Sequence, residues 1–316
     1  MSDDFEDWGL EATLSEVRLS LQDWINHGNP EGFECRALAL FRWQAERNPL
    51  MREFVHAMGI RPDEVKRVED IPFLPIQFFK SAEIKSGSWA TYHVFRSSGT
   101  TDTVQRSNHL IDADGLEWYR HIAQTAWMQM WRQEVHEYHW LGLLPGYTGR
   151  EDASLLTMVK GFMTASGQFP DDAMLMNDPK ALRRAIERWS RASDRQPLVI
   201  VGVTWAVLDW MHHLDNDPQW LKGIPWEEVL LVDTGGVKGR DVEPTRLDVL
   251  SAIRRSLPQV KIASEYGMTE MFSQGYALDG EHHQFPSWVR PLVRDVRDPL
   301  SEPRIQRTGR LDIIDL

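Results

Sequence analysis

The sequence has 316 residues and a formal net charge of −12, from 35 Lys and Arg against 47 Asp and Glu, which argues against general nucleic-acid binding because that activity needs a basic surface. Its length allows one large α/β domain or about two smaller ones. A single cysteine, Cys35, excludes an intramolecular disulfide and a cysteine-based zinc site, and an acidic N-terminus without an apolar run of membrane-spanning length predicts a cytoplasmic protein.

The first 85 residues are predicted to be a helical N-terminal region. Apolar side chains recur at helical spacing in three segments, 12–27, 37–47 and 50–58, and Asn-Pro pairs separate them. We interpret this region as a packed cap without chemistry of its own, in which Cys35 is a small core residue. The following segment, 71–80, holds two prolines in an apolar run, which favours an extended conformation beside the next loop.

A loop rich in hydroxyl side chains follows the extended segment. Its central residues are Ser97, Ser98, Gly99, Thr100 and Thr101. Hydroxyls and backbone N–H groups that face one way can wrap an anionic phosphate, and glycine permits its close approach. The same residue types also form ordinary surface turns, so the loop alone leaves both interpretations open.

The segment 86–316 is predicted to be an α/β core. After the loop, the pattern indicates a long helix at 114–133, a buried strand at 138–145 and a helix at 153–164. From residue 197 the order is β-α-β-α-β, with strands at 198–203, 229–233 and 260–264 and helices at 205–214 and 244–257. Right-handed crossovers fold this order into a parallel sheet. A last apolar strand is expected at 309–316, and the fourteen tryptophans predict core packing and an aromatic-lined pocket.

Polar residues follow each strand of the β-α-β-α-β segment. Because ligands bind at the carboxyl ends of parallel strands, these residues should converge on one crevice. A nucleotide there could place its base against Tyr266 or against the glycines Gly235 and Gly236. Glu270, with the Thr269 hydroxyl, could supply oxygen ligands to magnesium.

The sequence lacks the motifs of several other enzyme classes. It has no Gly-x-x-x-x-Gly-Lys-Ser/Thr after a strand, no Gly-x-Gly-x-x-Gly and no Gly-x-Ser-x-Gly. Its histidine pairs have no carboxylate partners at metal-binding spacing, which favours solvated or structural roles. Lys238 could offset phosphate charge, or it could be a solvated lysine in a turn.

Several segments resemble one group of enzymes. The loop at 97–101 and the motif Tyr266-Gly-Met-Thr-Glu270 resemble, in this order, two motifs of the adenylate-forming superfamily. The segments 71–80, 235–240 and 264–274, with the final Ile313-Ile-Asp-Leu316, resemble its acyl-protein synthetase (LuxE-type) family. The resemblance extends from about residue 70 to the end. It implies an α/β fold, that of the large N-terminal domain of an adenylate-forming enzyme, with mainly parallel sheets flanked by helices.

The resemblance also implies an activity. Enzymes of this family are ligases that use ATP and Mg²⁺ to activate a carboxylic acid, here expected to be a fatty acid, as an acyl-adenylate for transfer to a thiol. The carboxylate attacks the α-phosphate, and pyrophosphate leaves. By position, the phosphates would contact Ser97, Ser98, Gly99, Thr100 and Thr101, the adenine would contact Gly235, Gly236, Tyr266, Gly267 and Met268, and the catalytic residues would be Lys238, Thr269 and Glu270, with Glu270 also the magnesium ligand.

Three features depart from the family pattern. Asp102 stands where the phosphate loop usually has glycine, and the lysine that often follows the loop is replaced by Gln105 and Arg106 nearby. The sequence ends at Leu316, before the family's ribose-binding aspartate, its small C-terminal domain with the catalytic lysine, and its acyl-accepting cysteine. A second interpretation is therefore a nucleotide-binding, non-catalytic subunit that docks onto an acyl reductase or a carrier protein.

Overall fold

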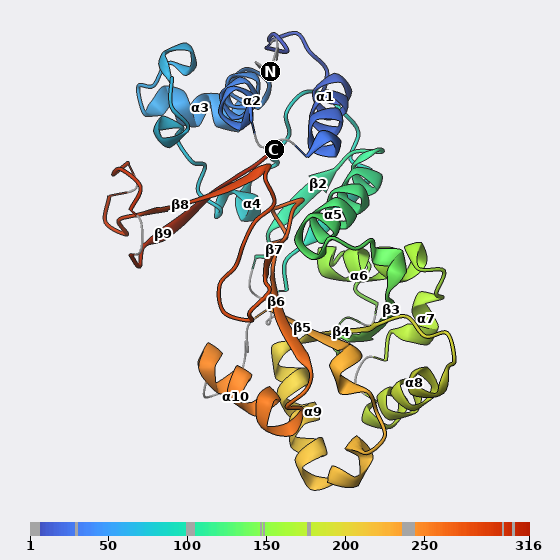
Figure 1. The fold of residues 1–316 in the computed structure, drawn as a ribbon. Coiled ribbons are helices and arrows are strands. Elements are labelled where there is room, and N and C mark those ends of the chain that lie inside the picture. Colours follow the sequence, from blue (N-terminus) through green and yellow to red (C-terminus); the bar gives the residue numbers. More distant parts are fainter. Residues whose placement is uncertain are drawn as a thin grey trace. The chain divides into compact units, whose positions relative to one another are not determined.

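The chain forms a mixed α/β fold with a largely parallel five-stranded sheet and a group of N-terminal helices (Figure 1). The computed structural model describes residues 7–28, 31–98, 105–145, 147, 149–175, 178–235, 244–298, 300–304 and 307–316. Contacts divide the chain into two units, neither of which is continuous in sequence. Unit 1 comprises Met1–Leu116, Glu270–Phe272 and Phe285–Leu316, and unit 2 comprises Glu117–Thr269 and Ser273–Gln284. The boundary expected at residue 85 stays a prediction.

Three helices open unit 1 where the periodicity predicts them: α1 Leu14–His27, α2 Phe33–Arg47 and α3 Pro49–Ala57. The Asn48 side chain caps α3 by accepting the Met51 N–H at 3.1 Å. Pro49 occupies the first helical position, where its missing N–H costs nothing. Phe41, Met51 and Val55 belong to one apolar core, so α2 and α3 pack together.

The prediction that Cys35 is a core residue is wrong. α2 buries a stripe that includes Phe33, Ala37 and Phe41, and Cys35 lies outside this stripe, exposed. Its Sγ donates to the carbonyl of Gly32 at 2.9 Å. The expected helix begins at residue 37, whereas α2 begins at Phe33. Cys35 therefore lies inside the helix, where the helical periodicity places its side chain away from the buried stripe.

The segment 71–80 is largely non-helical, as its prolines predict, and runs into the short helix α4 Phe78–Ser81. Two 3-10 turns precede it, Pro62–Glu64 and Val68–Asp70. The Phe79 ring lies edge-on to the His109 ring, with centroids 5.9 Å apart. His109 belongs to β2, Asn108–Ile111, which pairs antiparallel with β1, His93–Arg96. The segment therefore packs beside the two strands that flank the expected phosphate loop.

A second antiparallel pair completes unit 1. It consists of β8 Val289–Arg294 and β9 Arg310–Asp315, and β9 corresponds to the strand expected at 309–316. Pro291 lies within β8 opposite Ile313. A two-stranded pair has a free edge on each strand, where a proline without its N–H is tolerated.

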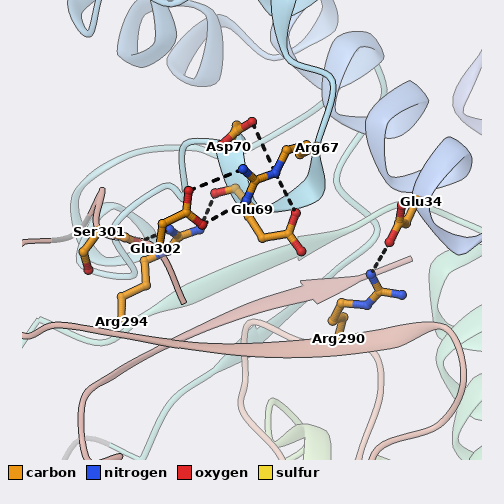
Figure 2. Close-up of polar contacts among 8 residues, drawn as sticks. All are labelled: Glu34, Arg67, Glu69, Asp70, Arg290, Arg294, Ser301 and Glu302. Atoms are coloured by element: carbon orange, nitrogen blue, oxygen red, sulfur yellow. Dashed lines mark hydrogen bonds and ion pairs between the residues drawn. The ribbon is translucent and has the colours of Figure 1, made fainter. Parts of the chain in front are cut away.

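Arg294 joins the end of the chain to its N-terminal part (Figure 2). Its side chain is only 3% exposed, and Nε donates to Asp312 Oδ2 at 2.9 Å. Its two terminal nitrogens donate to the carbonyl oxygens of Ser301 and Glu69, each at 2.5 Å. One buried guanidinium thus connects β8, β9, the loop between them and the second 3-10 turn.

Figure 2 also shows two ion pairs that join the same parts of the chain and that, unlike the Arg294 pair, are exposed. Arg67 contacts Glu302 at 2.9 Å, and Arg290 of β8 contacts Glu34 of α2 at 3.0 Å. Exposed pairs contribute little stability, so Arg294 is the more important connection.

Unit 2 contains the five-stranded sheet, in the order β3-β4-β5-β6-β7. The first four strands run parallel, and β7 is antiparallel to β6. Their bounds are His139–Leu143, Leu198–Val203, Val229–Thr234, Lys261–Tyr266 and Gly275–Ala277. Every residue of β4 and β5 is buried, as expected for central strands covered on both faces.

Helices cover both faces of this sheet (Figure 1). α5 Gly115–Trp131 and α6 Ser154–Ala165 lie on one face, and α9 Thr204–Asn216 and α10 Arg246–Ser256 lie on the other. The connection from α6 to β4 contains α7 Pro170–Ala173 and α8 Pro179–Arg191. Short 3-10 turns occur at Val135–Glu137, Pro218–Leu221 and Trp226–Glu228.

Aromatic residues pack on both faces of the sheet. On the α5–α6 face, Trp127 stacks on Trp131 with ring centroids 3.9 Å apart, and Tyr276 of β7 meets Trp131 edge-on at 4.6 Å. Trp210 of α9 lies 6.0 Å from Trp220. Core packing is thus confirmed as one use of the tryptophans.

Within the described ranges, no helix has the length and apolar character needed to cross a membrane.

Candidate functional site

The carboxyl ends of β4, β5 and β6 lie next to one another at one edge of the sheet. Their register pairs Gly202 with Asp233 and Asp233 with Ser264, so the residues that follow each strand emerge side by side. The β-α-β-α-β order predicts this adjacency. Side chains alternate between faces along a strand, and Asp233 and Thr234 therefore point to opposite faces of the sheet.

On the α9–α10 face, a buried carboxylate connects several segments. Asp233 is 1% exposed and accepts two hydrogen bonds from Arg246 of α10, at 2.6 Å and 2.8 Å. Arg246 Nε also donates to the carbonyl of Gly280. Thr204, the first residue of α9, donates to the carbonyl of Gly235 at 2.7 Å and lies 3.1 Å from the Asp233 carboxylate. Because a bidentate charged pair is strong and directional, Arg246 fixes the end of β5 against α10, and the Thr204 hydroxyl links the same strand end to α9.

On the α5–α6 face, the buried carboxyl belongs to Glu265, which is 6% exposed. The Thr234 hydroxyl donates to its Oε2. Burial raises the pKa of Glu265 to about 7; the Thr234 hydrogen bond opposes this rise, and the negative charge of Asp233 adds to it. Burial also raises the pKa of Tyr147 and of Tyr276, with a contribution from the Glu265 charge. The Glu265 carboxyl therefore titrates near neutral pH, far above an exposed glutamate.

The Tyr266-Gly-Met-Thr-Glu270 motif begins at the last residue of β6 and continues as a turn. Tyr266 is half-buried, and its hydroxyl contacts the Met268 sulfur at 3.2 Å. The Tyr266 ring lies edge-on to His283 with centroids 5.8 Å apart. Burial, with the positive charge of Arg246, lowers the pKa of His283, so a neutral imidazole packs beside the tyrosine.

Gly267 lies directly over the Glu265 carboxyl. Its backbone is exposed, yet a Cβ at this position would come within 2.5 Å of Glu265 Oε1. Any larger residue here would therefore require the Glu265 carboxyl to move. The next two motif residues, Thr269 and Glu270, are half-buried, and the division between the units passes between them.

The first residue of the expected phosphate loop is engaged in the β1–β2 pair. The Ser97 N–H donates to the Ser107 carbonyl at 3.1 Å, and the Ser107 N–H donates to Ser97 Oγ at 3.0 Å. Arg106 Nε donates to the Ser97 carbonyl at 2.7 Å. The Ser97 N–H is therefore already used, and its hydroxyl proton is the group suited to a phosphate. Ser98 is exposed.

The candidate residues that the structure describes divide between the two units. Ser97, Ser98 and Glu270 belong to unit 1, and Gly235, Tyr266, Gly267, Met268 and Thr269 belong to unit 2. Five more lie outside the described residues: Gly99, Thr100, Thr101, Gly236 and Lys238. The ligand roles of all these residues stay predictions.

Sequence reasoning missed the roles of Arg246 and Glu265. A signal for Arg246 existed, because Asp233 ends an apolar strand and a buried carboxylate needs a cation, which the next helix can supply. No comparable signal marks Glu265, because three consecutive residues of β6, Ala263 to Glu265, are buried, and burial there does not follow the alternation of a half-buried strand.

A cavity of about 650 Å³ lies elsewhere in unit 2, at the amino end of β3. Its lining includes His139 and Leu141 of β3, Trp189 of α8, and Gln196 before β4. His139 and Gln196 lie at the amino ends of the parallel strands β3 and β4, so this cavity is at the opposite edge of the sheet from the strand ends described above. None of the candidate residues that the structure describes lines it.

No family model matches the chain, and no curated protein matches its sequence. Among solved structures, the crystal structure of CmiS6 is similar, with a TM-score of 0.40 and 15% sequence identity. The similarity covers 66% of this chain and 46% of the CmiS6 chain, so the chain spans less than half the length of that protein. A likeness this distant carries no argument about function.

Proposed function

We propose that the chain is an acyl-adenylating enzyme of the acyl-protein synthetase type, which uses ATP to activate a carboxylic acid, such as a fatty acid, for transfer to a thiol. One observation carries the proposal: the Tyr266-Gly-Met-Thr-Glu270 motif leaves the carboxyl end of a parallel strand beside the end of β5 that continues into Gly235. Open α/β sheets bind nucleotides at this edge.

The described residues at this edge suit a nucleotide. Gly235 has a φ of 71°, and apart from its chain neighbours no described residue lies within 4 Å of the place where its Cβ would be, which suits the close approach of a flat ring. Tyr266 offers an aromatic ring beside it. Arg246 is neutralised by Asp233. In this proposal the phosphate charge is met by hydroxyls, by N–H groups and by Lys238.

The proposed reaction has two steps. An oxygen of the substrate carboxylate forms a bond to the α-phosphorus of ATP while the bond from that phosphorus to the pyrophosphate oxygen breaks. A thiolate sulfur of a carrier or reductase protein then attacks the acyl carbon, and AMP leaves. In this scheme Ser97 and Thr269 donate hydroxyl hydrogen bonds to phosphate oxygens, and Lys238 offsets the charge that develops there.

Glu270 is the residue proposed to hold magnesium. Among the described residues, no three His, Cys, Asp or Glu side chains are grouped to hold a metal ion. Magnesium fits a lone carboxylate of this kind, because it usually keeps several waters and binds one or two carboxylates together with substrate phosphates. When bound, it would supply positive charge to the phosphates.

Calorimetry and pyrophosphate exchange test the proposal on the full chain. We expect saturable binding of AMP and of ATP with magnesium, and exchange of labelled pyrophosphate into ATP that depends on an added carboxylic acid. Fatty acids of graded length would then define the substrate. A protein that circular dichroism shows to be folded, but that binds neither nucleotide, would end the proposal.

The substitution Glu270→Gln separates the metal role from the nucleotide site. The amide keeps the size of the side chain but removes its charge, so ATP binding with magnesium should weaken by roughly tenfold or more, about 1.4 kcal/mol, while metal-free AMP binding changes little. Glu281→Gln, at an exposed glutamate, is the matched control and should affect neither. Equal losses for ATP and AMP would exclude Glu270 as a metal ligand.

A further inference from the structure

One buried carboxyl touches both strand ends that the proposed nucleotide site uses. Thr234, the register partner of Glu265 in β5, donates its hydroxyl to Glu265 Oε2. The other oxygen, Oε1, lies so close to the Gly267 backbone that a Cβ there would be 2.5 Å away. A single side chain therefore spans from the end of β5 to the turn that follows β6.

We propose that Glu265 is a positioning residue, whose carboxyl holds the Tyr266–Met268 turn against the end of β5 through Thr234 and Gly267. This inference rests on the proposed function, since it concerns the same nucleotide site. Glu265 is 6% exposed and lies on the side of the sheet that α5 and α6 cover, the side of its register partner Tyr276, whose ring meets Trp131 of α5. Tyr266 is the next residue along the strand and so points to the opposite face.

The titratable groups around this carboxyl come from several elements. Asp233 contributes negative charge from β5, Tyr147 faces Glu265 from the loop after β3, and Tyr276 faces it from β7. Tyr119 of α5 acts on Tyr276 rather than directly on the carboxyl. These groups are acidic, so each one that ionises adds negative charge around Glu265.

The protonation state of Glu265 should therefore control how firmly the turn is held. A neutral carboxyl can stay buried and keep its contacts with Thr234 and Gly267. An ionised carboxyl would be a buried charge near a second carboxylate, which favours its movement toward water. The turn should be held firmly in acid and released as the pH rises past neutrality.

Calorimetry with AMP as the probe tests this role in Glu265→Gln, Glu265→Ala and Thr234→Val, from about pH 5.5 to about 8.5. Wild-type affinity should fall by roughly tenfold as the pH passes about 7. Glu265→Gln keeps hydrogen-bonding groups and cannot ionise, so its affinity should lack this step. Glu265→Ala and Thr234→Val should bind AMP more weakly than the wild type below about pH 7, because each removes one part of the bridge, and the difference should narrow at higher pH as the wild-type carboxyl ionises.

Two results would overturn the inference. One is a wild-type pH profile that Glu265→Gln reproduces, since the phosphate of AMP has its own pKa near about 6 and would then explain the whole effect. The other is undiminished AMP affinity in Glu265→Ala. Recovery by glutamine of what alanine loses would support positioning over a simple need for the carboxylate charge.

Hydrogen exchange at the amides of 266–268, without nucleotide, separates this inference from the proposed function. Protection factors corrected for intrinsic rates should fall in the wild type as the pH passes neutrality and stay level in Glu265→Gln. If this difference appears while AMP binds to no variant, the proposed function fails and the bridge is supported. If AMP binds but neither glutamine nor alanine alters exchange, the bridge is refuted and the proposed function stands.

Discussion

Replacing Arg294 by methionine should weaken unit 1 far more than replacing an exposed arginine there. Arg294 donates to the Asp312 carboxylate and to the carbonyls of Ser301 and Glu69. Methionine fills much of the volume but donates nothing. Asp312, whose side chain is 2% exposed, would keep Arg310 as a partner at 2.9 Å, and two carbonyls would lose a donor.

The expected loss follows from the burial of this pair. Removing one partner of a buried ion pair costs about 3–5 kcal/mol, because the other charge stays in a poorly solvated place. Arg310, 32% exposed, compensates in part, which sets the expectation near the lower limit of about 3 kcal/mol. Arg67→Met is the matched control: the side chain of Arg67 is 52% exposed and that of its partner Glu302 is 72% exposed, and such exposed pairs contribute little stability.

Native-state hydrogen exchange measures this difference locally, which matters because a chain of two units need not unfold in one step. The amides of β8 and β9 should exchange on the order of 10²-fold faster in Arg294→Met than in the wild type, equivalent to about 3 kcal/mol. Those of β4 and β5 should change little. Equal, small effects of Arg294→Met and Arg67→Met would refute the reasoning.

Two further predictions concern unit 2. Burial raises the pKa of Glu265 from 4.5 to about 7, so the stability that its protonated carboxyl contributes is complete below pH 4.5 and is lost as the pH rises through 7. The loss is about 3 kcal/mol, and the difference in unfolding free energy between wild type and Glu265→Gln, measured by urea unfolding, should change by that amount. A difference that does not depend on pH would contradict this prediction. Arg246→Met should lower the free energy of unfolding by about 3–5 kcal/mol at neutral pH, because it leaves Asp233 buried without its cation. Arg255→Met, at a 68% exposed arginine of the same helix, should lower it by about 1 kcal/mol or less in the same assay. Similar losses in the two variants would show that the buried pair contributes no more than the exposed one.

Elements with local signals could be predicted from the sequence. The bounds of β4 agree with the expected strand, because six apolar or glycine residues follow Pro197. Strands β1, β2 and β7 have three or four residues each, too few for a recognisable alternation, and each is defined by its antiparallel pairing with a neighbouring strand. In β8, Pro291 hides a strand whose partner lies about twenty residues later.

The candidate site shows a similar limit. Topology predicts which strand ends meet, but burial at those ends depends on where neighbouring helices start. Arg246 follows Asp233 by thirteen residues in the sequence, and it can contact Asp233 because it is the first residue of α10. A count of hydroxyls around Ser97 also cannot reveal that its N–H is already paired with Ser107.

Unit 1 draws on both ends of the chain, with about 170 residues between Leu116 and Phe285. A ribosome that adds about 5–20 residues per second would need roughly 10–30 s to cross that interval. The small core of α2 and α3 can pack as soon as it emerges, but the guanidinium of Arg294 cannot meet Asp312 until both have been synthesised. During synthesis, the five-stranded sheet of unit 2 can therefore fold before unit 1 is completed by its last two strands, β8 and β9.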